Sequence, residues 1–510
     1  MANTINVPKS HLIMGLSLPL AVLIGYFLAE PMELGSIAVV VVVLGILCIP
    51  LLMKWYYPVL VFCWNATIVP AVLPGRPSLW SIMAFVGLVL ATLTRAINPK
   101  ARFLSVPSLT RPLLLLAAIA VATGLMTGGF GARAMGSEHY GGSRYFALMA
   151  AIAGYFVLTS RRIPPSRAGI YVACFFLSGL TSAIGNLAAA AGPQFYFLFS
   201  IFTSGWATDQ LAAQNAVSVG MVRIGGLMVA SGAAYSYLLA RFGIRGLLDL
   251  KRPWRLGFFM AAVAAGLFGG FRSYVALFAL TFLVLFVLEG LHRTRYLPAL
   301  LGVVLLGSVI VLPHANRLPM VTQRALSFLP GRFDPIALRS AETTLDWRFE
   351  MWREVLPEVP RYLFRGKGFG FDSDDLYLAS IAQRRFQSEY LAGTITAGDY
   401  HNGPLSILIP LGIYGMIAFL WFLIAGVRVL YRNYRYGSPD YRNLNSLIMA
   451  AFIARALFFF TGFGALVSDM AVFAGLLGMS VAINGTEAFV RSEAEQPAVG
   501  VELGTEYIRA

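Results

Sequence analysis

The chain has 510 residues, of which 58% are hydrophobic and 12% are charged, and its formal net charge is +15. A soluble protein of this length cannot bury so much apolar surface, and apolar runs of about 18 residues or more, each long enough to cross a bilayer as a helix, recur along the sequence. The composition therefore excludes a soluble globular protein and predicts an all-α polytopic membrane protein, whose positive charge belongs to cytoplasmic loops and which needs no nucleic-acid partner.

Fourteen apolar stretches are candidate membrane spans: residues 11–29, 34–53, 56–73, 79–96, 112–127, 144–160, 169–191, 217–240, 256–270, 273–290, 296–313, 404–430, 444–462 and 467–484. The first ends in "AEPMELGS", which lacks a small-x-small cleavage site, so we expect a membrane helix and not a cleaved signal peptide. The ninth stretch is short, and Pro58 and Pro70 interrupt the third. We therefore expect about 12–14 transmembrane helices.

The basic residues fall on alternate connections between these stretches. If the N-terminus is cytoplasmic, the Lys- and Arg-rich loops 94–111, 160–167, 241–255, 289–295 and 428–442 all lie inside. Cytoplasmic loops are enriched in Lys and Arg, so both termini are expected in the cytoplasm. The expected organisation is an N-terminal transmembrane bundle (1–313), a large outer loop (314–403), C-terminal transmembrane helices (404–485) and a cytoplasmic tail (486–510).

The large outer loop contains an amphipathic stretch at residues 343–359. Leu345, Phe349, Trp352 and Leu356 recur near helical spacing, with charged residues between them. A loop this long without structure would be unusual, so we expect the segment to fold as a small helical cap with these four residues on its apolar side.

A histidine and an asparagine stand directly before the twelfth apolar stretch, in "GDYHNGPLSILIPLG" (398–412). On the expected topology His401 lies on the outer side, where a neutral imidazole can take a proton from a hydroxyl. Asp399 could orient the ring, and Asn402 could cap the helix that follows. The alternatives are a loop histidine that caps a helix or lies in water, and a solvated acid at Asp399.

Four arginines are expected at or near the outer side: Arg223, Arg272, Arg348 and Arg455. A charge at membrane depth is costly, so it usually faces protein or a wet cavity and has a partner. Guanidinium groups bind phosphate oxygens bidentately without a metal. For Arg223 and Arg272, snorkelling to the interface is an equally open explanation. For Arg455 we expect a structural ion pair with Asp469.

The sequence contains no recognisable metal or cofactor motif. The acidic run "DSDD" (372–375) could bind a divalent cation, but a solvated turn is favoured. The three cysteines suit neither a metal site nor a disulfide framework. No Walker loop, dinucleotide fingerprint or Ser-His-Asp order is visible. We therefore expect no metal site and no cofactor.

Three stretches together resemble one known family. "RFEMWREVLPEVPRYLFRGKGFGF" (348–371) has an Arg, a Trp four residues later and a Gly-x-Gly turn; "HNGPLSILIPLGIYG" (401–415) has a His-Asn start and Leu-Gly-Ile-x-Gly in the span; "GGFRSYVALF" (269–278) resembles the start of an earlier span. This pattern is similar to that of the O-antigen ligase and O-antigen polymerase superfamily. The chain departs from it at Pro410, where the family often has an acid, and at Arg272, which precedes a serine and does not follow one.

The resemblance implies a bacterial inner-membrane glycosyltransferase that works at the outer face of the membrane. It implies a glycan donor on undecaprenyl pyrophosphate, a lipid or glycan acceptor such as lipid A-core, and contacts with membrane lipids. The transfer is expected to be metal-independent and inverting. The implied roles are His401 as the catalytic base, Arg223, Arg348 and Arg272 as the pyrophosphate-binding residues, and Asn402, Asp399 and Trp352 as supporting residues.

Three other functions remain open. An O-antigen or exopolysaccharide polymerase would use the same donor, and only the acceptor groove would distinguish it from a ligase. A protein O-oligosaccharyltransferase is less favoured, because those enzymes often carry an additional outer C-terminal region. A polysaccharide transporter or flippase usually shows paired halves with ionisable residues at mid-membrane, whereas the polar residues here concentrate in one outer loop.

Overall fold

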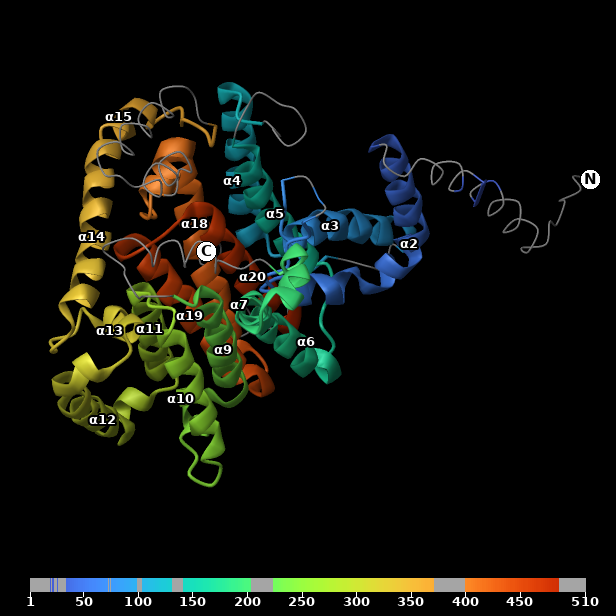
Figure 1. The fold of residues 1–510 in the computed structure, drawn as a ribbon. Helices are drawn as coiled ribbons and strands as arrows, with labels where there is room; N and C mark the ends of the chain where they lie inside the picture. The colour runs from blue at the N-terminus through green and yellow to red at the C-terminus, as the bar shows by residue number, and fades with distance from the viewer. Residues whose placement is uncertain are drawn as a thin grey trace, which may run out of the picture. The chain divides into compact units, whose positions relative to one another are not determined.

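The computed structural model of the chain is built from helices (Figure 1), and it describes residues 19, 21–22, 25, 34–71, 73, 75–98, 103–130, 141–202, 223–370 and 400–485. The helices in these residues are α2 (Leu34–Cys63), α3 (Leu79–Ile97), α4 (Pro107–Thr127), α5 (Gly142–Leu158), α6 (Pro165–Leu177), η2 (Ser178–Thr181), α7 (Ser182–Ala191), η3 (Pro193–Ser200), α9 (Gly225–Leu247), α10 (Trp254–Leu267), α11 (Arg272–Leu288), η4 (Leu291–Arg293), α12 (Tyr296–Val311), η5 (Leu312–Arg317), α13 (Met320–Leu326), α14 (Pro335–Val355), α15 (Glu358–Tyr362), α18 (Leu405–Tyr436), η6 (Pro439–Tyr441), α19 (Arg442–Thr461) and α20 (Leu466–Asn484).

The chain divides into two compact units, residues 1–57 and 58–510. Every candidate site residue belongs to the second unit, so the description that follows concerns that unit.

Eight helices in the described residues are long and apolar enough to cross a membrane: Leu79–Ile97, Pro107–Thr127, Pro165–Ala191, Gly225–Leu247, Tyr296–Arg317, Leu405–Tyr436, Pro439–Thr461 and Leu466–Asn484. Three shorter apolar helices, α5, α10 and α11, occupy three further expected spans. These helices confirm the predicted all-α polytopic membrane protein.

Two expected spans were drawn wrongly. Residues 34–53 and 56–73 were expected as separate spans, but one helix, α2, runs from Leu34 to Cys63, and the described residues that follow it leave the helix. Lys54 interrupts the apolar run without interrupting the helical backbone, so hydropathy placed a boundary inside the helix. The first expected span, 11–29, lies outside the described residues except for four positions.

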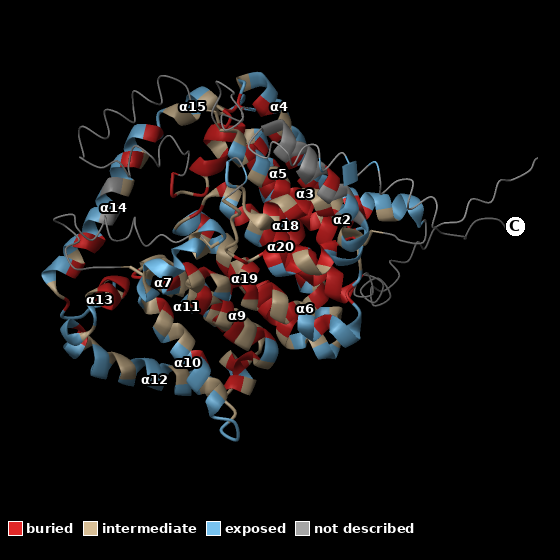
Figure 2. Cartoon of the chain, turned by 45° about the vertical axis from the view of Figure 1, so that its right-hand side comes forward, coloured by how far each residue is buried: buried red, intermediate tan, exposed pale blue. Residues whose placement is uncertain are grey.

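The centre of the unit is formed by α18, α19 and α20, where buried residues concentrate (Figure 2). Small residues allow the helices to approach closely: a Cβ at Gly478 would lie 2.7 Å from Leu158 Cδ1 of α5, and one at Gly475 would lie 2.0 Å from Trp64 Nε1. The packing of α20 against α5 and Trp64 therefore has no room for larger side chains at these positions.

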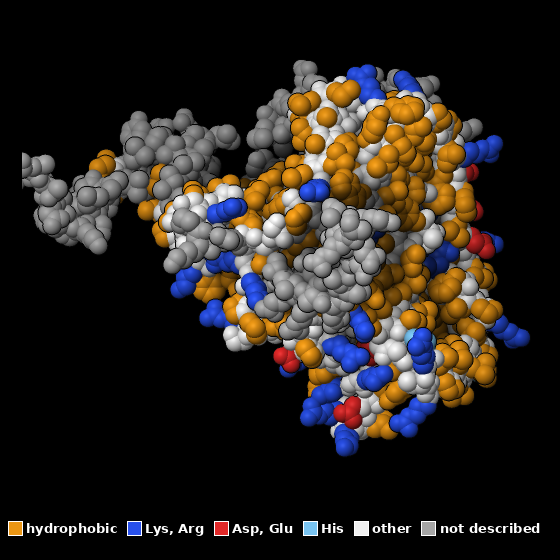
Figure 3. Space-filling model, turned by 180° about the vertical axis from the view of Figure 1, so that it is seen from behind, with side chains coloured by type: hydrophobic (Ala, Val, Ile, Leu, Met, Phe, Trp, Pro, Cys, Tyr) orange, Lys and Arg blue, Asp and Glu red, His pale blue; other side chains and the backbone are white. Residues whose placement is uncertain are grey.

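The outer surface of the helices is largely apolar. Figure 3 shows hydrophobic side chains over much of one face, with Lys and Arg gathered towards its lower end. The extreme case is α12, in which no residue is buried. An apolar surface of this kind belongs against lipid, and a basic end is expected on the cytoplasmic side.

The segment between α12 and α18 folds as a helical cap, as expected, with α13, α14 and α15 in its described part. The predicted apolar side of α14 is only partly correct: the buried residues include Ala341, Met351 and Val355, whereas Leu345 and Phe349 are exposed. At about 100° per residue, the centre of the buried face is rotated by roughly 90° from the predicted stripe. The helix is buried through Ala341, Met351 and Val355, whereas the prediction followed the larger side chains Leu345, Phe349, Trp352 and Leu356.

Candidate active site

His401 lies in the turn that begins α18. It is 7% exposed and has a positive φ of 49°, a backbone conformation that is uncommon outside glycine. Asn402 Oδ1 accepts a hydrogen bond from the Leu405 amide at 3.1 Å, and the Asn402 carbonyl accepts one from the Ser406 amide at 2.9 Å. Asn402 thus caps the helix as predicted. His401 directly precedes the capping residue and has a strained conformation of the kind that gathers at functional sites.

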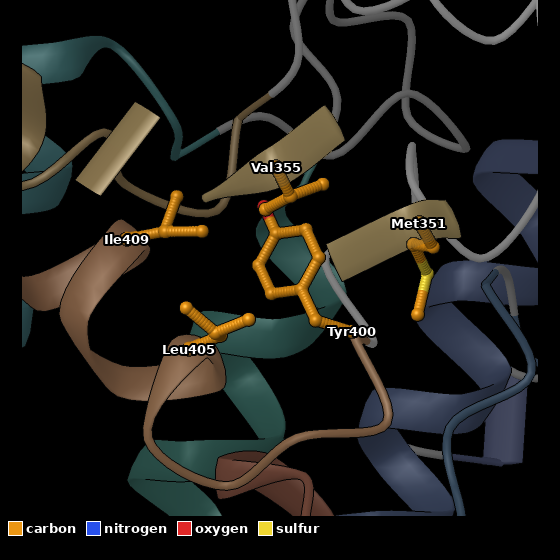
Figure 4. Packing of buried hydrophobic residues seen from close by; sticks show 5 residues of the cluster. All are labelled: Met351, Val355, Tyr400, Leu405 and Ile409. Carbon is orange, nitrogen blue, oxygen red and sulfur yellow. The ribbon is translucent and has the colours of Figure 1, made fainter. Parts of the chain in front are cut away.

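Trp352 of α14 holds the backbone next to His401. Its indole Nε1 donates a hydrogen bond to the Tyr400 carbonyl at 2.7 Å. Around this bond, buried side chains from the end of α14 and the start of α18 form one apolar cluster (Figure 4) of Met351, Val355, Tyr400, Leu405 and Ile409. The Arg-x-x-x-Trp and His-Asn motifs are therefore packed against each other.

Phe463, in the turn between α19 and α20, is shared by His401 and Arg348. The rings of His401 and Phe463 are nearly perpendicular, at 88°, with centroids 4.8 Å apart. The guanidinium carbon of Arg348 lies 5.6 Å from the centroid of the same phenyl ring. A cation and an imidazole held by one aromatic wall form a compact pair of functional groups.

The turn that carries Phe463 is fixed by the predicted ion pair between Arg455 and Asp469. Arg455 Nε contacts Asp469 Oδ1, and Asp469, which is fully buried, also accepts a hydrogen bond from the Ala465 amide at 2.8 Å. The Leu466 amide donates to Ser406 Oγ at 3.0 Å, which ties the same turn to α18. The predicted ion pair is confirmed, and it stabilises the turn whose Phe463 packs against His401.

The other predicted arginines gather at the start of α11. Arg272 Nη2 donates to the Ala341 carbonyl of α14 at 2.7 Å. Arg223 lies with its guanidinium carbon 5.7 Å from the ring centroid of Phe271, directly before Arg272. Ala341 and Arg348 are seven residues apart and so share one face of α14. The loop before α11 therefore brings Arg223 and Arg272 to the side of α14 that carries Arg348.

A fourth arginine, Arg324 of α13, completes this group and was missed from the sequence. It is buried, contacts the Gly270 carbonyl through Nη1 and donates from Nε to Ser340 Oγ at 3.1 Å. Burial, together with the positive charges of Arg223, Arg272 and Arg348, lowers its pKa to about 9. Since the charges of Arg223, Arg272 and Arg348 all act on Arg324, the four arginines form one electropositive site, here called the arginine cluster.

Helix ends add to this potential. Helix α9 begins two residues after Arg223, and α11 begins at Arg272 itself. The N-terminal end of a helix carries a partial positive charge and unpaired amide groups, which favour an anion. The arginine cluster is thus placed where the backbone also attracts negative charge.

The Gly-x-Gly turn that follows the Arg-x-x-x-Trp motif meets a break in α18. Gly412 leaves the helical conformation with a φ of 66°, and the Ile409 and Pro410 carbonyls accept hydrogen bonds from Lys367 at 2.8 Å and Gly368 at 2.9 Å. Pro410 has no amide hydrogen and cannot donate within the helix. The turn therefore satisfies backbone groups at the break and fixes the short first part of α18, at whose start His401 lies.

The sequence-predicted site residues that the structure describes thus lie close together. His401 and Arg348 share Phe463, Trp352 and Asn402 fix the backbone on either side of His401, and the arginine cluster joins Arg348 to the rest. Asp399 lies outside the described residues. An imidazole, which can accept a proton, beside a cluster of four arginines is an arrangement chemically suited to the transfer of a group from a phosphate or pyrophosphate ester.

Comparison with known families agrees with the motifs. Residues 256–420, about a third of the chain, match the family model described as O-antigen ligase. The match contains Arg272, Arg324, Arg348 and His401, whereas Arg223 lies outside it. No curated protein matches the chain. The family match confirms the predicted resemblance to the O-antigen ligase and polymerase superfamily.

Proposed function

Starting from the O-antigen ligase domain that residues 256–420 carry, we propose that this multi-pass membrane protein transfers a glycan from undecaprenyl pyrophosphate to an acceptor hydroxyl, on lipid A-core or a similar acceptor. The reaction takes place at the outer face of the bacterial inner membrane. The observation that supports this most directly is the proximity of His401 and Arg348 across Phe463, with three further arginines clustered around Arg348.

In the proposed reaction, a ring nitrogen of His401 takes the proton of the acceptor hydroxyl. The acceptor oxygen forms a bond to the anomeric carbon of the donor sugar as the bond from that carbon to the pyrophosphate oxygen breaks. Undecaprenyl pyrophosphate leaves with the electron pair, and the proton remains on His401 until it is released to water. A direct displacement of this kind inverts the configuration at the anomeric carbon.

The arginine cluster would bind the pyrophosphate and stabilise the charge that develops on it as it leaves. Guanidinium groups that are already positioned cost little reorganisation at the moment of reaction, which is the basis of electrostatic catalysis. Arg324 and Arg272 are held by backbone carbonyls and Ser340, so their directions are set before the donor binds. We propose that this charge makes the transfer independent of a metal ion.

A polymerase that uses the same donor is the second candidate, and a transporter the third. The donor site would be shared with a polymerase, whose acceptor is another lipid-linked repeat unit. A transporter would not require a base beside a pyrophosphate site, so the pairing of His401 with Arg348 favours an enzyme.

The test is the surface glycolipid ladder of a strain that lacks the gene, with rescue by the wild-type protein or by His401→Ala. A ligase predicts acceptor lipid without glycan and long chains left on the carrier, whereas acceptor lipid with a single repeat unit would indicate a polymerase. A normal ladder in the deletion strain, or full rescue by His401→Ala, would refute the assignment. Transfer by purified protein in EDTA tests whether a metal is needed.

A further inference from the structure

Helix α14 exposes an apolar band directly beside the candidate active site. Phe349 is 61% exposed, Leu356 57% and Leu345 41%, and Trp352, which is half-buried, lies at the inner edge of the same band. Counted around the helix at about 100° per residue, Trp352 is roughly 40° from Arg348 and Phe349 roughly 100° from it. The band therefore leads outward from the arginine cluster to the surface of the cap.

The band differs from the lipid-facing surface of the same unit. Helix α12 exposes its apolar residues on all sides and has no charged residue between Tyr296 and Val311. On α14 the exposed apolar band is bordered by the exposed charged side chains of Glu342, Asp346 and Arg353. Charged groups along one edge are costly inside a bilayer, so the occupant of this band must present both apolar and hydrogen-bonding surface.

The band is continuous with the site through aromatic contacts. The rings of Phe349 and Trp352 meet nearly perpendicularly, at 81°, with centroids 5.5 Å apart. Trp352 in turn donates to the Tyr400 carbonyl, one residue before His401. A ligand that packs on Phe349 is therefore separated from the backbone beside His401 by the side chain of Trp352 alone.

We propose that Phe349, together with the edge of Trp352, is a stacking platform for a pyranose ring of the glycan chain next to the reacting sugar. A pyranose has an apolar face of C–H bonds, which packs on the electron-rich face of an aromatic ring, and a rim of hydroxyl groups that hydrogen-bond to charged side chains. Phe349 supplies the ring, and Glu342, Asp346 and Arg353 supply hydrogen-bonding partners at the edge. The inference rests on the proposed function, because it takes His401 as the point of reaction.

The experiment uses the full chain in nanodiscs of native membrane lipid, with lipid-linked donor and acceptor glycolipid extracted from the source cells. Kcat and KM are measured with each glycolipid varied in turn for Phe349→Ala, Phe349→Leu and Phe349→Trp. Leu305→Ala on α12, a residue that is 68% exposed, is the matched control for loss of an exposed apolar side chain. Binding of each glycolipid without turnover is measured in the His401→Ala background, with and without Phe349→Ala.

Stacking predicts that Phe349→Ala and Phe349→Leu raise KM and Kd for one glycolipid by about 3- to 10-fold, with kcat within about twofold, whereas Phe349→Trp and Leu305→Ala behave as wild type. The affected glycolipid, donor or acceptor, identifies the glycan on the platform. The platform would be overturned if Phe349→Ala left KM and Kd unchanged for both glycolipids, or if Phe349→Leu bound both as the wild-type protein does. Transfer by His401→Ala would overturn the proposed function alone, since the binding measurement still tests Phe349.

Discussion

The arginine cluster brings four positive charges together, and the effect of that charge on Arg324 can be measured. A pKa lowered from the usual arginine value to about 9 means that keeping Arg324 protonated costs the folded protein about 5 kcal/mol. The largest part comes from burial, and the rest comes from Arg223, Arg272 and Arg348. Arg324→Gln removes this cost and loses hydrogen bonds to Gly270 and Ser340, worth about 1.5–3 kcal/mol each. The two effects on the free energy of unfolding are of similar size, so Arg324→Gln without a bound anion should be about as stable as the wild-type protein without one.

The same substitution should weaken the binding of a pyrophosphate. An anion in the cluster offsets the repulsion among the arginines and raises the pKa of Arg324, so loss of this charge should raise Kd for inorganic pyrophosphate by about tenfold or more. The assay is thermal unfolding of the purified protein over a pyrophosphate titration, because a ligand of the folded state raises Tm with its concentration. Arg353→Gln, an exposed arginine on the far side of α14, is the control and should bind as wild type.

The pH dependence has a definite sign. Below pH 9, Arg324 is protonated in the site without pyrophosphate. Above pH 9, Arg324 loses its proton in that site, and pyrophosphate binding must restore the proton. The affinity for pyrophosphate should therefore fall by up to about tenfold per pH unit. The Arg324→Gln variant in the same buffers corrects for titration of pyrophosphate itself. The pKa of Arg324 is lower in the folded than in the unfolded protein, so the stability of the ligand-free protein should rise as the pH rises above 9. Equal pyrophosphate affinity in wild type and Arg324→Gln would refute the cluster as an anion site.

Three further substitutions test the remaining parts of the site. His401→Ala should lower kcat by about 10²–10⁴ while the donor still binds, as measured by single-turnover transfer and a binding titration; a loss of binding alone would contradict a role as base. Asp469→Asn should leave Arg455 without its buried counter-charge and cost about 3 kcal/mol in thermal unfolding, whereas the neighbouring Ser468→Ala should cost little. Gly412→Ala should lower the free energy of unfolding by about 1–3 kcal/mol, because the φ of Gly412 is 66° and a Cβ there would lie 2.7 Å from the Leu363 carbonyl oxygen. An unchanged free energy of unfolding would show that the glycine conformation at the break in α18 is not needed.

The parts of the site that were predictable from sequence depend on local chemistry. Asn402 caps α18 because a side-chain oxygen two or three residues before a helix has amide groups to accept from. Arg455 and Asp469 pair because each is costly alone within an apolar segment. The spacing of Arg348 and Trp352 placed both on one side of a helix, and both contact the surroundings of His401.

The parts that were missed depend on contacts between distant residues. Arg324 looked like an ordinary loop arginine, but it is buried, and Ser340 and Gly270, which are 16 and 54 residues away, accept its hydrogen bonds. A charged residue among apolar neighbours, in "MVTQRALSF", was the available signal, but exposed loops contain many such patterns. Hydropathy also misplaced the inner face of α14, because Ala341 is buried and Phe349 is not.

Phe463 shows why the site is larger than its motifs. It lies beyond the residues that match the O-antigen ligase family, yet both His401 and Arg348 contact its ring. Its neighbours are Gly462 and Gly464, and a Cβ at Gly464 would lie 2.9 Å from the Gly403 Cα, so the turn can approach the start of α18 only because glycine is there. The turn is fixed by two hydrogen bonds: the Ala465 amide donates to the Asp469 carboxylate, and the Leu466 amide donates to Ser406 Oγ. The Arg455–Asp469 pair is structural in its energetics, but what it positions is the surface that holds the proposed base and one proposed pyrophosphate ligand together.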